Sequence, residues 1–311
     1  MIEARGLTKR YGSTLAVDDL SFTVRPGIVT GFLGPNGAGK TTSMRLILGL
    51  DAPTAGTVTI GGRPHRHAAS PMREVGALLD ARAVHGGRSA YNHLLCLAQT
   101  NGIPRRRVGE VLEIVGLAGV AGKRSKGFSL GMSQRLGIAA ALLGDPAVLM
   151  FDEPVNGLDP EGILWIRTLM RSLAAQGRVV FVSSHLMSEM ENTADHVIVI
   201  GRGRLIADSG MAEFIARNSS QTVLVQTPQP DALVRALVAA GGTVSPSGDQ
   251  NLEVRGLTVD QVGDIAFAHD IRIYHLAAAR ISLEQAFMEL TANSVDYRAA
   301  QPAGPEHGKE A

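Results

Sequence analysis

The beginning of the chain alternates apolar and polar positions in short runs. Residues 2–33 contain such runs, separated by the turn residues Gly12 and Arg25-Pro26-Gly27. A period of two, broken by turn residues, predicts antiparallel strands with one buried face. The last run, residues 28–33, is almost continuously apolar and leads into a glycine-rich segment. This pattern favours a strand buried on both faces, followed by a loop.

The middle of the chain changes to a helical period. Within residues 85–143 four apolar positions repeat at the spacing of one helix face: Val108, Val111, Leu112 and Val115. Pro104 precedes them and suits a first helical turn. Two short apolar runs follow at residues 147–151 and 179–183, with a helical pattern at 163–175 between them. Short buried strands alternating with helices predict a parallel sheet and an α/β fold.

After about residue 219 the pattern indicates a smaller second unit. Strands are predicted at 222–226, 252–254 and 271–276, and helices at 231–240 and from Thr258. The pairs Thr258/Gln261 and Ser282/Gln285 have capping-box spacing, and the second pair starts a closing helix. This order predicts a small α+β domain of the split-βαβ type. We therefore expect domains at 1–218 and 219–297, and a disordered tail at 298–311.

Composition narrows the class of protein. The 311 residues are 45% hydrophobic and 19% charged with a net charge of +1, which fits a globular protein and gives no field for nucleic acid. A single cysteine, Cys96, excludes a disulfide within the chain and fits a reducing compartment. The most apolar stretch, residues 136–151, is interrupted by Gly144, Asp145 and Pro146, and the N-terminus lacks the apolar core of a signal peptide. We expect the chain to reach a membrane through a partner.

One motif carries specific chemistry. Between the strand at 28–33 and a helical stretch, the chain matches G-x-x-x-x-G-K-[ST] with Gly34, Pro35, Asn36, Gly37, Ala38, Gly39, Lys40 and Thr41. Glycines let backbone N–H groups surround phosphates, and the following helix directs its positive end at them. Lys40 is expected to reach the terminal phosphates, and the Thr41 hydroxyl to bind Mg²⁺.

Polar residues end the later strands, where parallel sheets gather their ligands. Asp152 and Glu153 follow the run at 147–151, and we predict that Asp152 holds Mg²⁺ and that Glu153 activates the attacking water. His185 follows the run at 179–183 and is placed to touch the γ-phosphate. Ser129 and Gly131 begin a long apolar helix, and by themselves they fit a helix N-cap better than an anion site.

In this order the motifs resemble the ATP-binding cassette family over residues 2–218. The resemblance implies the fold of a P-loop NTPase cassette, with a parallel core sheet, an antiparallel β subdomain and a helical subdomain. It also implies that the chain is an ATPase that uses ATP and Mg²⁺. It assigns catalysis to Glu153, His185 and Lys40. It assigns nucleotide binding to Tyr11, stacked on adenine, to the phosphate loop through Thr42, and to Ser129, Gly131 and Asp159 of the opposing subunit. Ser129 and Gly131 match the family signature, and we call the segment from Phe128 to Gly137 the signature segment. This segment, with the C-terminal residues 283–291, is similar to exporters of the daunorubicin-resistance type.

The sequence departs from the family pattern at two positions. Asp80 stands where the family has a glutamine that links Mg²⁺ to the membrane subunit, and Val155 replaces a threonine. Asp80 could bind a metal-bound water or point towards the membrane partner, and we favour the metal role.

The resemblance also implies partners. One phosphate loop and one signature per chain imply two chains, as a homodimer or with a paired cassette subunit, at the cytoplasmic face of the membrane. A separate transmembrane permease subunit would be received by residues 82–92. Two alternatives are a soluble cassette acting on nucleic acid and a small phosphotransferase. The single cassette without a basic stripe opposes the first, and the signature segment opposes the second.

Overall fold

The computed structural model describes residues 1–81, 83–218, 221–246, 251–280, 284 and 287–288. The N-terminal strands form an antiparallel sheet in the order β2-β1-β4. Its strands are β1 (Ile2–Tyr11), β2 (Thr14–Val24) and β4 (Ala55–Ile60). The alternating pattern near the start of the chain therefore does form antiparallel strands, as predicted.

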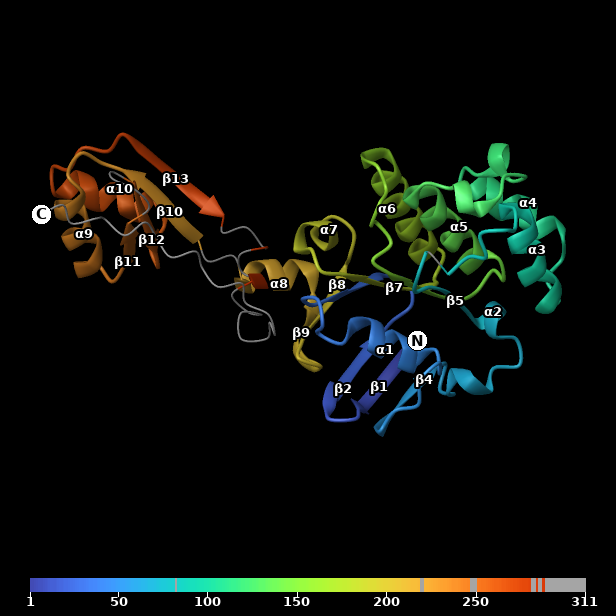
Figure 1. Ribbon diagram of the computed structural model, residues 1–311. Helices are drawn as coiled ribbons and strands as arrows, with labels where there is room; N and C mark the ends of the chain where they lie inside the picture. Colours follow the sequence, from blue (N-terminus) through green and yellow to red (C-terminus); the bar gives the residue numbers. More distant parts are fainter. Residues whose placement is uncertain (82, 219–220, 247–250, 281–283, 285–286, 289–311) are drawn as a thin grey trace, which may run out of the picture.

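A six-stranded sheet lies at the centre of the cassette, in the order β5-β6-β7-β3-β8-β9 (Figure 1). The first five strands are parallel and β9 is antiparallel. The strands are β3 (Val29–Leu33), β5 (Val75–Leu78), β6 (Val148–Asp152), β7 (Val179–Ser184), β8 (His196–Gly201) and β9 (Arg204–Gly210). Every residue of β3, β6 and β7 is buried, and the runs are apolar apart from Thr30 in β3 and the polar residues that end β6 and β7.

Helices cover this sheet and form a lobe beside β5 (Figure 1). They are α1 (Lys40–Ile47), α2 (Pro71–Glu74), α3 (Ala90–Thr100), α4 (Arg106–Ile114), α5 (Leu130–Leu142), α6 (Pro160–Ala175), α7 (Met187–Glu191) and α8 (Met211–Asn218). The predicted apolar face at Val108, Val111, Leu112 and Val115 is buried, which confirms that expectation. Pro104 lies two residues before α4 and outside it, so its predicted place in the first turn is wrong.

A four-stranded antiparallel sheet closes the described chain, in the order β11-β12-β10-β13. It consists of β10 (Gln221–Gln226), β11 (Thr243–Pro246), β12 (Asn251–Arg255) and β13 (His275–Arg280), with helices α9 (Pro230–Ala239) and α10 (Val259–Ala268). The element order and strand order agree with the predicted split-βαβ arrangement. The Thr258/Gln261 capping box is present with both of its hydrogen bonds.

The last strand begins later than its apolar pattern predicted. β13 starts at His275 instead of Ile271, because loop side chains satisfy the backbone before it. Thr227 donates its hydroxyl to the carbonyl of Arg272 at 2.7 Å, and the N–H of Arg272 donates to the side chain of Gln229 at 3.0 Å. These groups therefore have partners without a neighbouring strand.

The C-terminal sheet has its own apolar core, and α8 lies between it and the cassette (Figure 1). The chain then returns: Ser188 of α7 donates a hydrogen bond to Glu284 at 3.0 Å, and Phe287 is 5% exposed within the main core. A boundary at 218/219 remains our proposal, supported by this separate core. The predicted capping box at Ser282 and the predicted tail at 298–311 lie outside the described residues.

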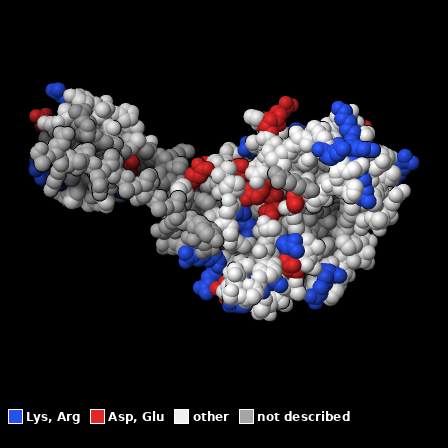
Figure 2. Space-filling model, viewed as in Figure 1, with Lys and Arg blue, Asp and Glu red and all other residues white. Residues whose placement is uncertain are grey.

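Charged side chains of both signs are spread over the face shown in Figure 2, where acidic groups gather near its middle and the described basic groups are scattered. None of the described helices is both long enough and apolar enough to cross a bilayer.

Three phenylalanine rings join the two N-terminal sheets. Phe22 of β2 lies 5.6 Å from Phe32 of β3 and 5.8 Å from Phe181 of β7, measured between ring centroids. Phe32 and Phe181 are 5.0 Å apart. All three rings are buried, so both the burial of apolar surface and the contacts between aromatic rings hold the antiparallel sheet against the central sheet.

We expect Phe22→Ala to destabilise the protein by about 3–5 kcal/mol, because a buried ring is replaced by a cavity between the sheets. The thermal unfolding midpoint of the full chain measures this. Phe267→Ala is the matched control, since Phe267 is 89% exposed and its loss should change stability by less than about 0.5 kcal/mol. Equal effects of the two substitutions would contradict the role given to the ring cluster.

Candidate functional site

The loop between β3 and α1 has the backbone that the glycine-rich motif predicts. Gly37 and Gly39 have φ angles of 82° and 101°, in the left-handed region. A Cβ atom on Gly39 would lie 2.5 Å from the carbonyl oxygen of Ala16, so no other residue fits there without a shift. Gly39 is also the N-cap of α1, and it has no side chain to satisfy the first N–H groups of the helix. These groups are free to bind an anion.

Lys40 is buried inside this loop, with 7% of its surface exposed. Its Nζ atom donates to the carbonyls of Gly34 at 2.6 Å and Pro35 at 3.3 Å, and it lies 3.6 Å from Oε1 of Glu153. Burial lowers the pKa of Lys40, and the opposing attraction of Glu153 and Asp152 does not fully offset it. The loop carbonyls and Glu153 thus hold one cation at the start of α1.

The Asp152 carboxylate joins three segments that are far apart in the sequence. It ends β6, is 9% exposed, and accepts hydrogen bonds from the hydroxyl of Thr41 at 2.6 Å and from the hydroxyl of Ser183 in β7. A threonine hydroxyl and a carboxylate are hard oxygen donors of the kind that Mg²⁺ prefers, and Mg²⁺ sites commonly use few protein ligands beside phosphates. Thr41 and Asp152 therefore fit the metal that the sequence implies.

Glu153 has an unusual backbone. Its φ angle is 49°, a conformation that costs free energy for a residue other than glycine. Two neighbours fix it there: its N–H donates to the hydroxyl of Ser183 at 2.9 Å, and the side chain of Gln134 donates to its carbonyl at 3.2 Å. The carboxylate is thereby directed at Lys40 and at His185, whose Nδ1 lies 2.8 Å from Oε2.

The segment around His185 is held by the half-buried carboxyl group of Glu189. Ser184 donates to Glu189 of α7 at 2.5 Å, and the N–H of Leu186 donates to the Ser184 hydroxyl at 3.0 Å. Burial raises the pKa of Glu189. The short turn that carries His185 is therefore held by hydrogen bonds of the residue before it and of the residue after it.

Tyr11 lies at the exposed end of β1, with 45% of its surface accessible. Its hydroxyl donates to Oδ2 of Asp51 at 2.7 Å, and Arg45 of α1 donates to the same oxygen at 2.7 Å. The Nζ atom of Lys9 lies 4.7 Å from the ring centroid. Hydrogen bonds from Arg45 and Tyr11 lower the pKa of Asp51 to about 2. The ring is fixed by its hydroxyl, Lys9 lies over one face, and the other face is the surface left for contact.

The residues expected to act in the opposing subunit's site form a second cluster, at the starts of α5 and α6. Ser129 is the N-cap of α5 and accepts from the N–H of Met132 at 3.2 Å, while Asp159 is the N-cap of α6 and accepts from Gly162 at 2.9 Å. A Cβ on Gly131 would lie 2.9 Å from the carbonyl oxygen of Gly157, so the two segments are in contact. Within the described chain, no hydrogen bond or ion pair joins Ser129, Gly131 or Asp159 to the phosphate loop.

The other predicted residues vary in position. Asn36 is exposed, Ala38 is buried and Thr42 is half-buried in α1. Asp80 is exposed two residues beyond β5, and Arg82 lies outside the described residues. In the part of the chain that the structure describes, no group of three or more His, Cys, Asp or Glu side chains is arranged to hold a metal ion. A metal role for Asp80 remains a prediction.

Three residues with clear positions in the site carried no predicted role. Ser183 contacts both Asp152 and Glu153, Gln134 fixes Glu153, and Asp51 fixes Tyr11. A polar residue in a buried strand, as Ser183 is, was the signal available in the sequence, because a buried hydroxyl needs a partner. Gln134 offered a similar signal on an apolar helix.

The sequence and the fold of the chain are similar to those of known proteins. Residues 17–156 match the family described as ABC transporter, and residues 221–284 match a domain family of unknown function. The chain is 37% identical to the uncharacterized ABC transporter ATP-binding protein YhcH of Bacillus subtilis, over 94% of this chain and 96% of the relative. It is 37% identical to the bacitracin transport ATP-binding protein BcrA of Bacillus licheniformis, over 95% and 91%. A solved structure, described as the ATP binding subunit of an ABC transporter, superposes with a TM-score of 0.64 at 25% identity, covering 70% of this chain and 92% of that one.

The Tyr11–Asp51 hydrogen bond leads to a prediction about ionisation. Burial and the Asp51 carboxylate raise the pKa of Tyr11 above its model-compound value of 10.0. In Asp51→Asn the negative charge is removed, so the pKa of Tyr11 should fall towards that value. Ultraviolet titration of each protein against its own Tyr11→Phe counterpart isolates this one phenol. The same midpoint with and without the Asp51 charge would show that the contact is absent in solution.

Proposed function

The chain belongs to the ABC transporter family, as its relationship to YhcH and the match at residues 17–156 show, and on this premise we propose that Glu153 is the catalytic base of its ATP site. Within the family the chain is an ATP-binding subunit and an ATPase. We also propose which residues perform the hydrolysis, how two chains complete the site, and which membrane protein is the partner.

The observation that carries the proposal is the position of the Glu153 carboxylate. One oxygen lies 3.6 Å from the Lys40 ammonium at the phosphate loop, and the other lies 2.8 Å from the His185 ring. Asp152 and Thr41, the residues suited to Mg²⁺, are hydrogen-bonded immediately beside it. A base, a phosphate-binding cation and a metal site thus converge at one edge of the sheet.

In the proposed mechanism each residue has one role. Lys40 exchanges its contacts with the loop carbonyls for the terminal phosphates of ATP, and the N–H groups of the loop and of α1 surround those phosphates. Mg²⁺ held by Thr41 and Asp152 would neutralise charge on the phosphates. Glu153 accepts a proton from the attacking water. His185 orients the Glu153 carboxylate through Nδ1 and presents Nε2 to the γ-phosphate.

We propose that two chains, as a homodimer or with a paired cassette subunit, form each complete site. Ser129, Gly131 and Asp159 lie on segments that the described contacts do not connect to the phosphate loop of the same chain. In this proposal they bind the γ-phosphate held by the opposing chain. The free N–H groups at the start of α5 and its positive dipole end suit that role.

We propose that the membrane partner is a separate transmembrane permease subunit, with the chain at the cytoplasmic face. A cleft of about 350 Å³ lies between the segment after Asp80, including Ala81 and Val84, and the signature segment, including Phe128. A helix of the permease bound in this cleft would contact both the segment after Asp80 and the signature segment. Export is supported by 36% identity, over 80% of this chain, to a Burkholderia orbicola protein named Nod factor export ATP-binding protein I. We also propose that Asp80 binds a metal-bound water in place of the family's glutamine.

Glu153→Gln should keep ATP binding and lower hydrolysis by about 10²–10⁴-fold, because the amide retains the shape of the side chain but cannot accept the proton. Phosphate release and nucleotide titration measure the two effects. Glu191→Gln, an exposed carboxylate at the end of α7, is the control and should hydrolyse ATP normally. Normal turnover in Glu153→Gln would remove Glu153 from the mechanism.

The dimer proposal is tested with Ser129 in the Glu153→Gln background. With ATP and Mg²⁺ this variant should shift from monomer to dimer in light scattering. Adding Ser129→Asp keeps a good N-cap for α5 but sets a negative charge against the γ-phosphate, so the ATP-dependent dimer should be lost. Ser129→Thr should retain it. If Ser129→Asp still dimerises with ATP, Ser129 is a helix cap and nothing more.

A further inference from the structure

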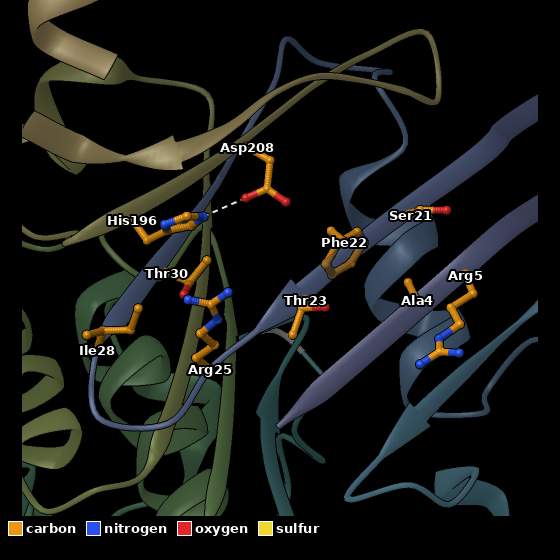
Figure 3. A pocket seen from close by; sticks show the side chains of 10 residues that line it. All are labelled: Ala4, Arg5, Ser21, Phe22, Thr23, Arg25, Ile28, Thr30, His196 and Asp208. Carbon is orange, nitrogen blue, oxygen red and sulfur yellow. Dashed lines mark hydrogen bonds and ion pairs between the residues drawn. The ribbon is translucent and has the colours of Figure 1, made fainter. Parts of the chain in front are cut away.

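A second cleft lies on the side of the cassette away from the phosphate loop. It has a volume of about 390 Å³ and is bounded by β1, β2, β3, β8 and β9 (Figure 3). Thr30 is the second residue of β3 and His196 is the first residue of β8, so the cleft opens at the amino-terminal ends of these parallel strands. The phosphate loop follows the other end of β3, about 13 Å along the strand from Thr30. The cleft is therefore separate from the ATP site.

Thr30 gives the cleft an unsatisfied hydrogen-bonding group. The residue is 1% exposed, and its Oγ1 atom has no hydrogen-bond partner among the described residues. The other residues of β3 are apolar or glycine. A valine at position 30 would have nearly the same shape as the threonine, without the unpaired hydroxyl. A buried hydroxyl without a partner is unfavourable. A polar group bound in the cleft would satisfy it.

Charged groups of both signs line the cleft: Arg5 and Arg25, and the carboxylate of Asp208. Arg25 lines the cleft, and no ion pair involving it occurs in the described part of the chain. Figure 3 shows its side chain extending towards Thr30, with Arg5 at the other end of the cleft. Arg5 has a long, exposed contact of 3.4 Å to Glu3. His196 is bound through Nε2 to Asp208 at 2.5 Å, which leaves Nδ1 of the ring for another partner.

The walls are not uniformly polar. Phe22 and Ile28 supply apolar surface on the same cleft. Guanidinium groups bind carboxylates and phosphates through paired hydrogen bonds, while apolar walls favour a ligand with an organic body. A volume of about 390 Å³ lies in the range of small-molecule sites.

From these observations we propose that the cleft binds a small organic anion, with its phosphate or carboxylate on Arg25 and a polar group on the Thr30 hydroxyl. The lining of the cleft includes none of the residues proposed to hydrolyse ATP. Because β3 leads from Thr30 to the phosphate loop, an occupant of the cleft contacts the same strand that positions Lys40.

The test uses the full chain carrying Lys40→Ala, so that the phosphate loop does not compete for the probes. Glycerol 3-phosphate, citrate and inorganic phosphate are titrated separately by calorimetry. At least one of the two organic probes should bind saturably at one site per chain and more tightly than inorganic phosphate, because the apolar wall contributes. Tightest binding by glycerol 3-phosphate identifies a phosphate ligand, and by citrate a carboxylate ligand.

Substitutions locate the binding. Arg25→Gln should weaken it by about tenfold, since a charge-assisted contact is lost. Thr30→Val should weaken it by about three- to tenfold while leaving the unfolding midpoint equal or higher, because the unsatisfied hydroxyl is removed. Arg171→Gln, an exposed arginine on α6, should have no effect. The proposal fails if neither organic probe binds saturably, or if binding is the same in Arg25→Gln and Thr30→Val as in their parent.

Discussion

The hydrogen bonds of the Asp152 carboxylate are the constraint on which the rest of the site depends. Thr41 at the start of α1 and Ser183 at the end of β7 both donate to it, so three separate segments meet at one charged group. Ser183 also accepts from the N–H of Glu153, which fixes the next residue in a left-handed backbone conformation. The proposed metal ligand Asp152 and the proposed base Glu153 are therefore positioned by the same hydroxyl. The parallel register of β6 and β7, in which Asp152 lies opposite Ser183, makes this possible.

Much of this could be predicted from the sequence, because the chemistry depends on residue types at fixed spacing. Lys40 and Thr41 follow a glycine pattern, and Asp152, Glu153 and His185 stand where buried strands end. The parallel sheet then brings these strand ends to one edge. What could not be predicted was how the residues are fixed. Gln134 reaches Glu153 from a helix 19 positions earlier in the sequence, and Asp51 reaches Tyr11 across 40 positions. No local pattern encodes such contacts.

The predicted ends of some helices and strands differ from the observed ends for a related reason. Apolar periodicity finds the centre of an element, whereas its ends depend on which groups satisfy the terminal backbone. α6 begins at Pro160, three residues before its apolar pattern, because Asp159 caps it. β13 begins late because the side chains of Thr227 and Gln229 take up the backbone of Arg272. The same principle applies to Ser129: acting as the N-cap of α5 places its hydroxyl at a helix end that can also face an anion.

We propose that ATP binds with Mg²⁺ where Thr41 and Asp152 meet beside Glu153. The most direct measurement is the affinity for ATP, by calorimetry, with Mg²⁺ and with a chelator, in the wild-type chain and in Asp152→Asn. We expect Mg²⁺ to strengthen ATP binding in the wild-type chain and this gain to be largely lost in Asp152→Asn, because a neutral amide holds the metal poorly. An equal gain from Mg²⁺ in both proteins would contradict the proposal.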